Sequence, residues 1–184
     1  MATSQRFNEP QWKPGGQKRG QLPRPLAPWL LDEGSLTARL QVHSQGDFEV
    51  QLLNQGWGQA KPSELIALKC SSRHKILVRE VLLKGKGQPW VFARSLVPYT
   101  SLTGRLKALK QLDNKPLGAL LFQDPNMHRD PIEVAAVHRH HNYVDASVAL
   151  AEDFELWGRR SVFYIDQNPL LVSEVFLPDF IASL

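Results

Sequence analysis

Two charged side chains occupy positions where the strand pattern around them is apolar. In the run KILVREVLL, Arg79 shares a face with three apolar residues, Leu77, Val81 and Leu83, because alternate residues of a strand point to the same side. In the run PLLVSEVFLP, Glu174 lies between Val172 and Phe176 on its own face. A charge on an apolar face is costly unless a partner compensates it. Each position therefore indicates either a structural ion pair or a binding site.

The residue types support two interpretations of these positions. Arg79 and Glu174 could form a buried ion pair with each other or with neighbours. Alternatively, they line a closed pocket in which Arg79 binds an anion and Glu174 binds a hydroxyl or ether oxygen. The planar guanidinium suits a carboxylate, because it donates two parallel hydrogen bonds. Strand alternation leaves both interpretations open.

The elements that must position these side chains are mainly strands. KILVREVLL and PWVFARSLVP are rich in β-branched and aromatic residues, and the glycine-bearing loop KGKGQ between them predicts a hairpin. RRSVFYID and PLLVSEVFLP predict a second hairpin around Gln167 and Asn168. Residues 48–57 and the run IEVAAV predict two further strands.

Helices are expected between these strands. Short helices are predicted after Pro28 and Ser35, over residues 62–68, and in PLGALLF with Pro116 at its start. GRLKALKQL predicts an amphipathic helix with leucines at helical spacing, namely Leu106, Leu109 and Leu112. The combination indicates an α+β fold in which helices cover one face of an antiparallel sheet.

Composition indicates one ordinary globular domain. The chain has 184 residues, of which 42% are hydrophobic and 22% charged, and no apolar run approaches the roughly 20 residues that span a bilayer. The net charge of +4 suits anionic ligands and nucleic acids alike. Residues 1–25 are rich in Pro, Gly and basic residues, so we expect a flexible basic tail without a secretory signal. A single domain is expected over residues 26–184.

The cysteine and histidine content bears on location and on metals. The single cysteine, Cys70, excludes an internal disulfide and agrees with a cytoplasmic protein. His138, His140 and His141 lie near Asp145 in the segment 138–153, which would suit a metal site. No HExxH motif or Cys/His pairing accompanies them, so we expect solvated histidines and no metal.

Five runs in a fixed order carry a family resemblance: LVREVLL, PWVFARSLVP, KPLGALLF, LWGRRS and PLLVSEVFLP, preceded by SLTARL. Together they resemble the chorismate–pyruvate lyases, which convert chorismate to 4-hydroxybenzoate and pyruvate at the start of bacterial ubiquinone biosynthesis. The resemblance covers residues 27–178. Between Arg129 and Trp157 the chain is longer than the family pattern, which could lengthen a flap over the site.

The resemblance implies a fold and a set of ligand contacts. It implies a sheet of about six strands with helices over one face, a ligand enclosed beneath helical flaps, and a monomer that needs no metal or cofactor. The implied ligand contacts are Leu36, Arg79, Leu117 and Glu174. Leu36 stands where the family usually has methionine. Leu117 follows Pro116 at a helix start, where main-chain N–H groups attract carboxylates.

For the reaction, the resemblance implies that Arg79 and main-chain N–H groups near Leu117 hold the ring carboxylate of chorismate. Glu174 would lie near the 4-position. It could protonate the departing oxygen as a general acid, or only position the substrate while the C4 proton passes to the enolpyruvyl methylene. A second cation, for the enolpyruvyl carboxylate, could be one of three arginines: Arg94, Arg159 or Arg160.

Two alternatives compete with this interpretation. The first is a non-enzymatic sensor of small aromatic acids, because ligand-binding domains of some bacterial transcription regulators resemble these lyases in fold. Such a regulator needs a DNA-reading helix-turn-helix module, which the Pro- and Gly-rich residues 1–25 do not supply, so no nucleic-acid partner is expected. The second is a related enzyme that acts on a different chorismate derivative.

Overall fold

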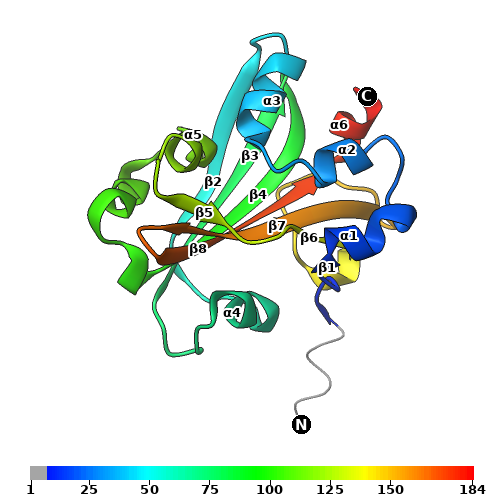
Figure 1. The fold of residues 1–184 in the computed structure, drawn as a ribbon. Helices are drawn as coiled ribbons and strands as arrows, with labels where there is room; N and C mark the ends of the chain where they lie inside the picture. Colours follow the sequence, from blue (N-terminus) through cyan, green and yellow to red (C-terminus); the bar gives the residue numbers. More distant parts are fainter. Residues whose placement is uncertain (1–7) are drawn as a thin grey trace.

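The chain folds around one antiparallel sheet that carries helices on its faces (Figure 1). The computed structural model describes residues 8–184. Its strands are β1 (Lys13–Pro14), β2 (Phe48–Gly58), β3 (Ile76–Gly85), β4 (Gln88–Pro98), β5 (Met127–Arg129), β6 (Glu133–His138), β7 (Glu155–Ile165) and β8 (Asn168–Phe176). Its α-helices are α1 (Gly15–Lys18), α2 (Ala27–Leu30), α3 (Leu36–His43), α4 (Pro62–Leu68), α5 (Leu117–Phe122) and α6 (Pro178–Ala182). Its 3₁₀ helices are η2 (Arg19–Gln21), η3 (Tyr99–Ser101), η4 (Gly104–Gln111) and η5 (Arg139–His141).

All strand pairings are antiparallel, in the order β1-β6-β7-β8-β4-β3-β2, and β5 pairs with β7 beside this path. The expected α+β class is confirmed, whereas the sheet has eight strands instead of the expected number of about six. The predicted strands correspond to the six long ones. The additional strands β1 and β5 contain only two and three residues, which is too short for an alternation pattern to reveal them.

Both predicted hairpins are present, and both have the same kind of turn. Lys86 and Gly87 have φ values of 52° and 76° between β3 and β4, and Asp166 and Gln167 have 48° and 69° between β7 and β8. Two consecutive positive φ values characterise the type I′ turn, whose twist matches that of the flanking strands. A two-residue turn sets the register of the hairpin.

Helices cover both faces of the sheet. In Figure 1, α2, α3 and α5 lie on one side of it and α4 on the other. Leu68 of α4 packs against apolar side chains of the central strands, namely Ile76, Val78, Leu96 and Leu171. The predicted range of α4 is confirmed. Its position differs from the expectation that helices cover one face only.

The segment predicted as an amphipathic helix is the 3₁₀ helix η4 together with its cap. Leu106, Leu109 and Leu112 recur at every third position, and all three are buried. A 3₁₀ helix has about three residues per turn, so this spacing places all three leucines on one side. The helix is therefore present, and its type differs from the predicted one.

Much of the predicted N-terminal tail contacts the sheet. Trp12 and Leu22 are buried, and Lys13 pairs with Val134 of β6. The structure thus differs from the expected flexible tail over residues 8–25, because these apolar side chains gain stability by leaving water. Residues 1–7, the remainder of that tail, lie outside the described residues.

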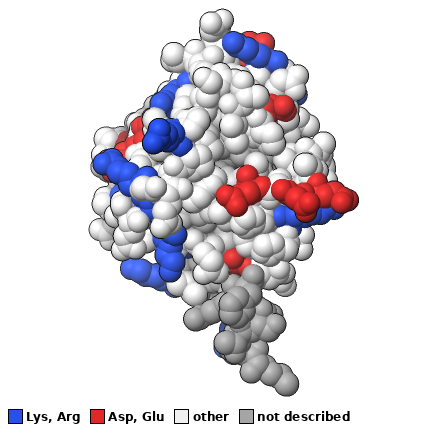
Figure 2. All heavy atoms as spheres, turned by 90° about the vertical axis from the view of Figure 1, so that its right-hand side faces the viewer, with Lys and Arg blue, Asp and Glu red and all other residues white. Residues whose placement is uncertain are grey.

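The surface shows no single dominant charge on the face that carries α1, α2 and α6. In Figure 2, most basic side chains on this face lie along its left-hand side and most acidic ones at its centre and right, and some of the two kinds touch. Among the helices of residues 8–184, none is long and apolar enough to cross a membrane.

A buried network of charged and polar side chains connects α4 to the sheet. Glu64 is fully buried and accepts hydrogen bonds from Arg94 Nε at 2.9 Å and from the Tyr143 hydroxyl at 3.2 Å. Arg94 Nη1 also donates to Glu80 at 2.7 Å. Burial, followed by the charge of Glu64, raises the pKa of Tyr143, so the hydroxyl stays protonated and donates. These partners compensate the burial of Glu64.

The histidines of the segment 138–153 lie at the end of β6 and in η5. The ring centroids of His140 and His141 are 4.2 Å apart, and those of His138 and His140 are 5.5 Å apart. His141 is buried, and its Nδ1 accepts a hydrogen bond from the His138 main-chain N–H at 3.0 Å. Within residues 8–184, no group of three or more His, Cys, Asp or Glu side chains is arranged to hold a metal ion. The structure instead gives His141 the role of a cap at the start of η5.

The network around Glu64 predicts a large effect from loss of its charge. Glu64→Gln should lower the free energy of unfolding by about 2–3 kcal/mol, because it removes the main counter-charge of buried Arg94. Glu49→Gln is a matched control, since Glu49 is exposed and pairs with Lys84 at 2.8 Å, and it should cost less than about 1 kcal/mol. Urea unfolding followed by circular dichroism measures both. Equal, small effects would show that the network contributes little.

The environment of His141 predicts a pH dependence of stability. Burial, followed by the charges of His140, His138 and Lys61, lowers the pKa of His141 from 6.5 to about 4. Between pH 7 and 5 the unfolded chain takes up a proton at this site and the folded protein does not, so the free energy of unfolding should fall by about 2 kcal/mol.

The variant His141→Asn tests whether His141 causes this pH dependence, because asparagine retains a hydrogen-bond acceptor and does not titrate. Its free energy of unfolding should change less with pH than that of the original protein, by about the same 2 kcal/mol. Chemical unfolding at several pH values measures the difference. The same pH slope in both proteins would contradict the assignment to His141.

Candidate active site

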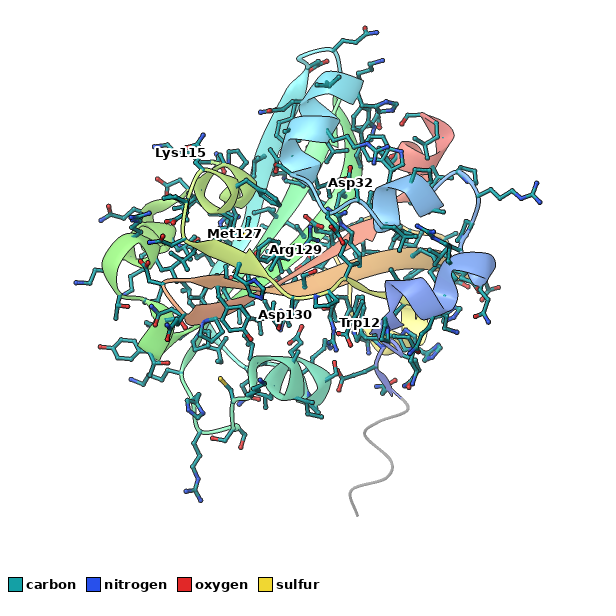
Figure 3. The ribbon with its side chains drawn as sticks, in the orientation of Figure 1. Trp12, Asp32, Lys115, Met127, Arg129 and Asp130 are labelled. Atoms are coloured by element: carbon teal, nitrogen blue, oxygen red, sulfur yellow. The ribbon has the colours of Figure 1, made fainter. Side chains whose placement is uncertain are left out.

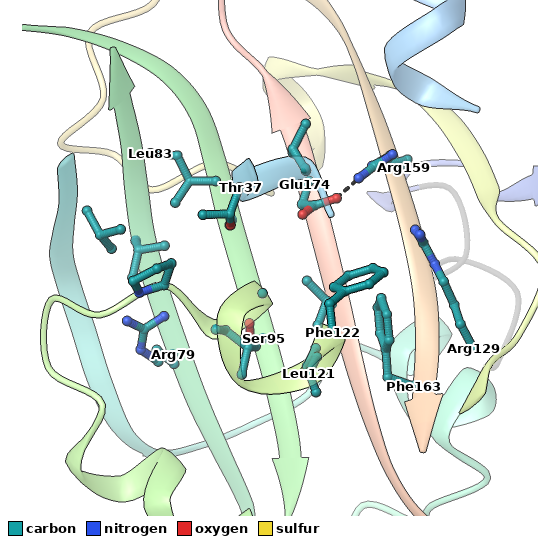
Figure 4. A pocket seen from close by; sticks show the side chains of 18 of the residues that line it. Thr37, Arg79, Leu83, Ser95, Leu121, Phe122, Arg129, Arg159, Phe163 and Glu174 are labelled. Atoms are coloured by element: carbon teal, nitrogen blue, oxygen red, sulfur yellow. Dashed lines mark hydrogen bonds and ion pairs between the residues drawn. The ribbon is translucent and has the colours of Figure 1, made fainter. Parts of the chain in front are cut away.

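A cavity lies between the sheet and the helices α3 and α5 (Figure 4). Strands β3, β4, β7 and β8 contribute its floor, and the starts of α3 and α5 contribute its cover. All four residues predicted to contact a ligand line it, namely Leu36, Arg79, Leu117 and Glu174. The fold thus brings these distant positions together. Their contact with a ligand stays a prediction.

The register of the central strands fixes the relative positions of Arg79 and Glu174, the two charged residues on apolar strand faces. Arg79 of β3 pairs with Ser95 of β4, and Glu174 of β8 pairs with Ala93 of β4. Strand β4 therefore lies between the strands of the two charged side chains, which are on the same face of the sheet. Because Ser95 and Ala93 are small, they leave space above β4 between the two charges.

Arg79 is buried and forms no ion pair within the described part of the chain. Its Nη2 donates to the main-chain oxygens of Asp113 and Lys115 at 2.8 and 2.9 Å. Its Nε is buried and has no hydrogen-bond partner among residues 8–184. Burial lowers the pKa of Arg79 to about 10, which still leaves the guanidinium charged at neutral pH. A buried cation with an unused donor favours an anionic ligand.

Glu174 pairs with Arg159 and not with Arg79. The residues are opposite each other in the β7–β8 register, and Arg159 Nε donates to Glu174 Oε2 at 2.6 Å (Figure 4). Arg159 Nη1 donates to the main-chain oxygens of Trp29 and Asp32 at 2.8 and 2.7 Å. The hypothesis of an ion pair between Arg79 and Glu174 is wrong, whereas pairing of Glu174 with a neighbour is confirmed. The pair uses Oε2 and leaves Oε1 of Glu174 for other contacts.

The cavity contains a third arginine, Arg129, which the sequence did not reveal. It comes from the short strand β5 and lies over the sheet (Figure 3). In the strand register Arg129 is opposite Phe163 of β7, which lines the same cavity. A strand of three residues has no alternation from which its face could be predicted. Only the pairing of β5 with β7 shows that Arg129 belongs to the cavity.

Of the three arginines considered for a second carboxylate, Arg159 lines the cavity and the other two lie on the opposite face. Arg94 binds Glu64 there, and Arg160 Nε donates to Glu133 at 2.7 Å. Arg159 and Arg160 are neighbours in β7, so their side chains point to opposite sides of the sheet. Arg94 and Arg160 therefore lie outside this cavity and pair with carboxylates of the protein, and Arg159 is the one of the three alternatives that lines it.

Two helix starts meet above the cavity. Leu36 and Leu117 are the first residues of α3 and α5, so their main-chain N–H groups have no partner within the helix. A Cβ atom on Gly118 would lie 2.9 Å from Thr37 Oγ1. Because Gly118 has no side chain, α5 can approach α3 closely. This arrangement agrees with the expected cover of helical flaps.

The lining defines the class of ligand that the cavity can hold. Three arginines and one glutamate line it, namely Arg79, Arg129, Arg159 and Glu174. The excess of positive charge favours a small anion. The apolar lining, which includes Val81, Leu83, Leu121, Phe122, Phe163 and Val172, favours a hydrocarbon ring. Fixed charges in such a cavity can orient a ligand and stabilise charge that develops on it.

Solved structures share the fold of this chain. The effector domain of PhnF from Mycobacterium smegmatis matches it with a TM-score of 0.54 and 16% identity, over 81% of this chain and 91% of that chain. A GntR-family transcriptional regulator from Bacillus cereus matches with a TM-score of 0.53 and 12% identity, over 72% and 93% of the two chains. At these identities the likeness concerns the fold alone.

The sequence comparisons identify a family. A protein of Psychromonas ingrahamii named "Probable chorismate pyruvate-lyase" is 45% identical over 159 residues, which cover 83% of this chain and 82% of that protein. A protein of the same name from Pseudomonas putida is 42% identical over 174 residues, or 94% and 93% of the two chains. The family model described as Chorismate lyase matches residues 8–183. This chain therefore belongs to the chorismate lyase family.

Proposed function

We propose that this protein is a chorismate–pyruvate lyase, which converts chorismate to 4-hydroxybenzoate and pyruvate. The observation that carries the proposal is the covered cavity with excess positive charge, in which Arg79 has a buried donor without a partner among residues 8–184. The names of the relatives support the same reaction. The proposal includes entry of the product into ubiquinone biosynthesis, as the family resemblance implies.

The ring carboxylate of chorismate is assigned to the Arg79 side of the cavity. Arg79 supplies the charge, and the main-chain N–H groups at the starts of α3 and α5 supply further donors. Because Leu36 and Leu117 would contribute main-chain atoms, leucine in place of methionine at position 36 should matter little. 4-Hydroxybenzoate retains this carboxylate, so Arg79 serves both substrate and product.

Glu174 is assigned to the other end of the ring. Its Oε2 is held by Arg159, so its Oε1 can accept a hydrogen bond from the C4 hydroxyl of chorismate, which becomes the phenol of the product. In the reaction the C3–O bond breaks, its electron pair forms the ketone of pyruvate, and the C4 proton passes to the enolpyruvyl methylene carbon. The ring becomes aromatic, so the reaction is strongly downhill and depends on orientation and electrostatics.

The enzyme is further proposed to act as a cytoplasmic monomer without a metal or cofactor. The family resemblance supports these points. The stoichiometry supports the absence of a redox cofactor, because chorismate has the same atoms and the same overall oxidation state as its two products together. The reaction therefore needs no external oxidant or reductant.

A sensor of small aromatic acids is the second candidate function, because regulatory proteins share the fold. A sensor would bind 4-hydroxybenzoate and leave chorismate unchanged. The two functions therefore differ in one measurable property, the release of pyruvate.

Incubation of the protein with chorismate is expected to release 4-hydroxybenzoate and pyruvate in equal amounts, measured by chromatography and a coupled pyruvate assay. Arg79→Met should lower kcat/KM by about 100-fold and weaken 4-hydroxybenzoate binding, because it removes a buried charged anchor. Arg105→Met is the control, since that exposed arginine pairs with Asp124 outside the cavity, and it should retain activity. No turnover by the original protein, together with tight 4-hydroxybenzoate binding, would support the sensor instead.

Glu174→Gln distinguishes positioning from general acid catalysis. If Glu174 only orients the hydroxyl, the amide keeps a hydrogen bond and kcat should fall by less than about tenfold, whereas loss of a general acid lowers rates by about 100-fold to 10,000-fold. Glu174→Leu, which removes the hydrogen bond, should raise KM. Steady-state kinetics measures both variants. A loss in the larger range for Glu174→Gln would refute the positioning role.

A further inference from the structure

We propose that Arg129 binds the carboxylate of the enolpyruvyl group, so that it recognises the substrate and not the product 4-hydroxybenzoate. This inference rests on the proposed lyase function and adds a specificity residue to it. Chorismate has two carboxylates, of which 4-hydroxybenzoate keeps only the one on the ring. A second cation in the cavity would therefore distinguish the two ligands.

The side chain of Arg129 is held in place on three sides. Its Nε donates to Ser161 Oγ and its Nη1 to the Glu33 main-chain oxygen, both at 3.0 Å. The guanidinium carbon lies 4.9 Å from the centroid of the Phe163 ring. Within residues 8–184, these hydrogen bonds use Nε and Nη1 and leave Nη2 for a ligand. A cation that is positioned before the ligand arrives loses little conformational entropy on binding.

Arg129 has no carboxylate partner in the described part of the chain. Its two hydrogen bonds go to neutral oxygens. Burial, followed by the charge of Arg159, lowers its pKa to about 10, so it stays charged at neutral pH. A partly buried cation without a counter-ion gains most from an anionic ligand.

The other two arginines of the cavity have other roles, since Arg79 is assigned to the ring carboxylate and Arg159 pairs with Glu174. Arg159 binds Glu174 and two main-chain oxygens, so it has less capacity for a ligand. Arg79 and Arg129 lie on opposite sides of the cavity, with Glu174 between their strands (Figure 4). In chorismate the ring carboxylate and the ether-linked enolpyruvyl group are likewise on different sides of the ring. With the ring carboxylate at Arg79 and the C4 hydroxyl at Glu174, Arg129 faces the remaining anionic group.

The alternative is that Arg129 is only structural, since it joins β5, β7 and the segment before α3. A structural residue would affect both ligands alike, through the stability or the shape of the cavity. A ligand-specific residue would affect chorismate alone. Comparison of substrate and product therefore distinguishes the two roles.

The test is the variant Arg129→Met, measured with chorismate as substrate and with 4-hydroxybenzoate as a competitive ligand. We expect kcat/KM for chorismate to fall by about 30-fold to 100-fold, with 4-hydroxybenzoate affinity within about threefold of the original. Arg129→Lys keeps the charge and should recover part of the loss. Arg79→Met is the matched comparison, since it should weaken both ligands.

The outcomes separate this inference from the function on which it rests. If the original protein does not convert chorismate, the proposed function fails. If it does and Arg129→Met has normal kcat/KM, or weakens both ligands equally, only the role of Arg129 is refuted. If Arg129→Met does not fold, Arg129→Gln decides, because glutamine keeps hydrogen-bonding groups and removes the charge. A folded Arg129→Gln protein with normal kcat/KM for chorismate would refute the role of Arg129.

Discussion

The ion pair between Glu174 and Arg159 is the interaction on which the geometry of the cavity depends. It joins β8 to β7 at 2.6 Å and, through the main-chain oxygens of Trp29 and Asp32, joins the sheet to the segment before α3. It also compensates the carboxylate of Glu174 within the protein. As a result, the positive charge left for a ligand lies on Arg79 and Arg129, at the two sides of the cavity.

Buried charged side chains on the two faces of the sheet differ in how completely they are paired. On the face of α4, Arg94 is shared between Glu64 and Glu80, and the Tyr143 hydroxyl supplies another hydrogen bond. The charged groups of that network have partners within the protein. On the cavity face, Arg79 retains a buried donor that has no partner in the described part of the chain. Incomplete compensation of this kind is typical of a binding site, because the ligand supplies the missing partner.

The starts of helices α3 and α5 cover the cavity. Gly118 permits close contact with Thr37, so α5 and α3 meet above the ligand position. We expect a ligand beneath this cover to exchange when the two starts separate, and such motions often limit turnover. The product also lacks the carboxylate assigned to Arg129. Loss of one of two charged contacts on reaction would favour departure of the product over that of the substrate.

The sequence by itself determined the α+β class, the six long strands, the range of α4 and the two charges on apolar strand faces, because alternation and turn residues act over a few neighbouring positions. It left open the partner of Glu174, and the short strands β1 and β5 gave no pattern. The tertiary structure decided that Arg159 faces the cavity while Arg94 and Arg160 face away, and it placed Arg129 beside Phe163. These outcomes depend on strand register and on contacts between distant segments, which a pattern along the chain does not contain.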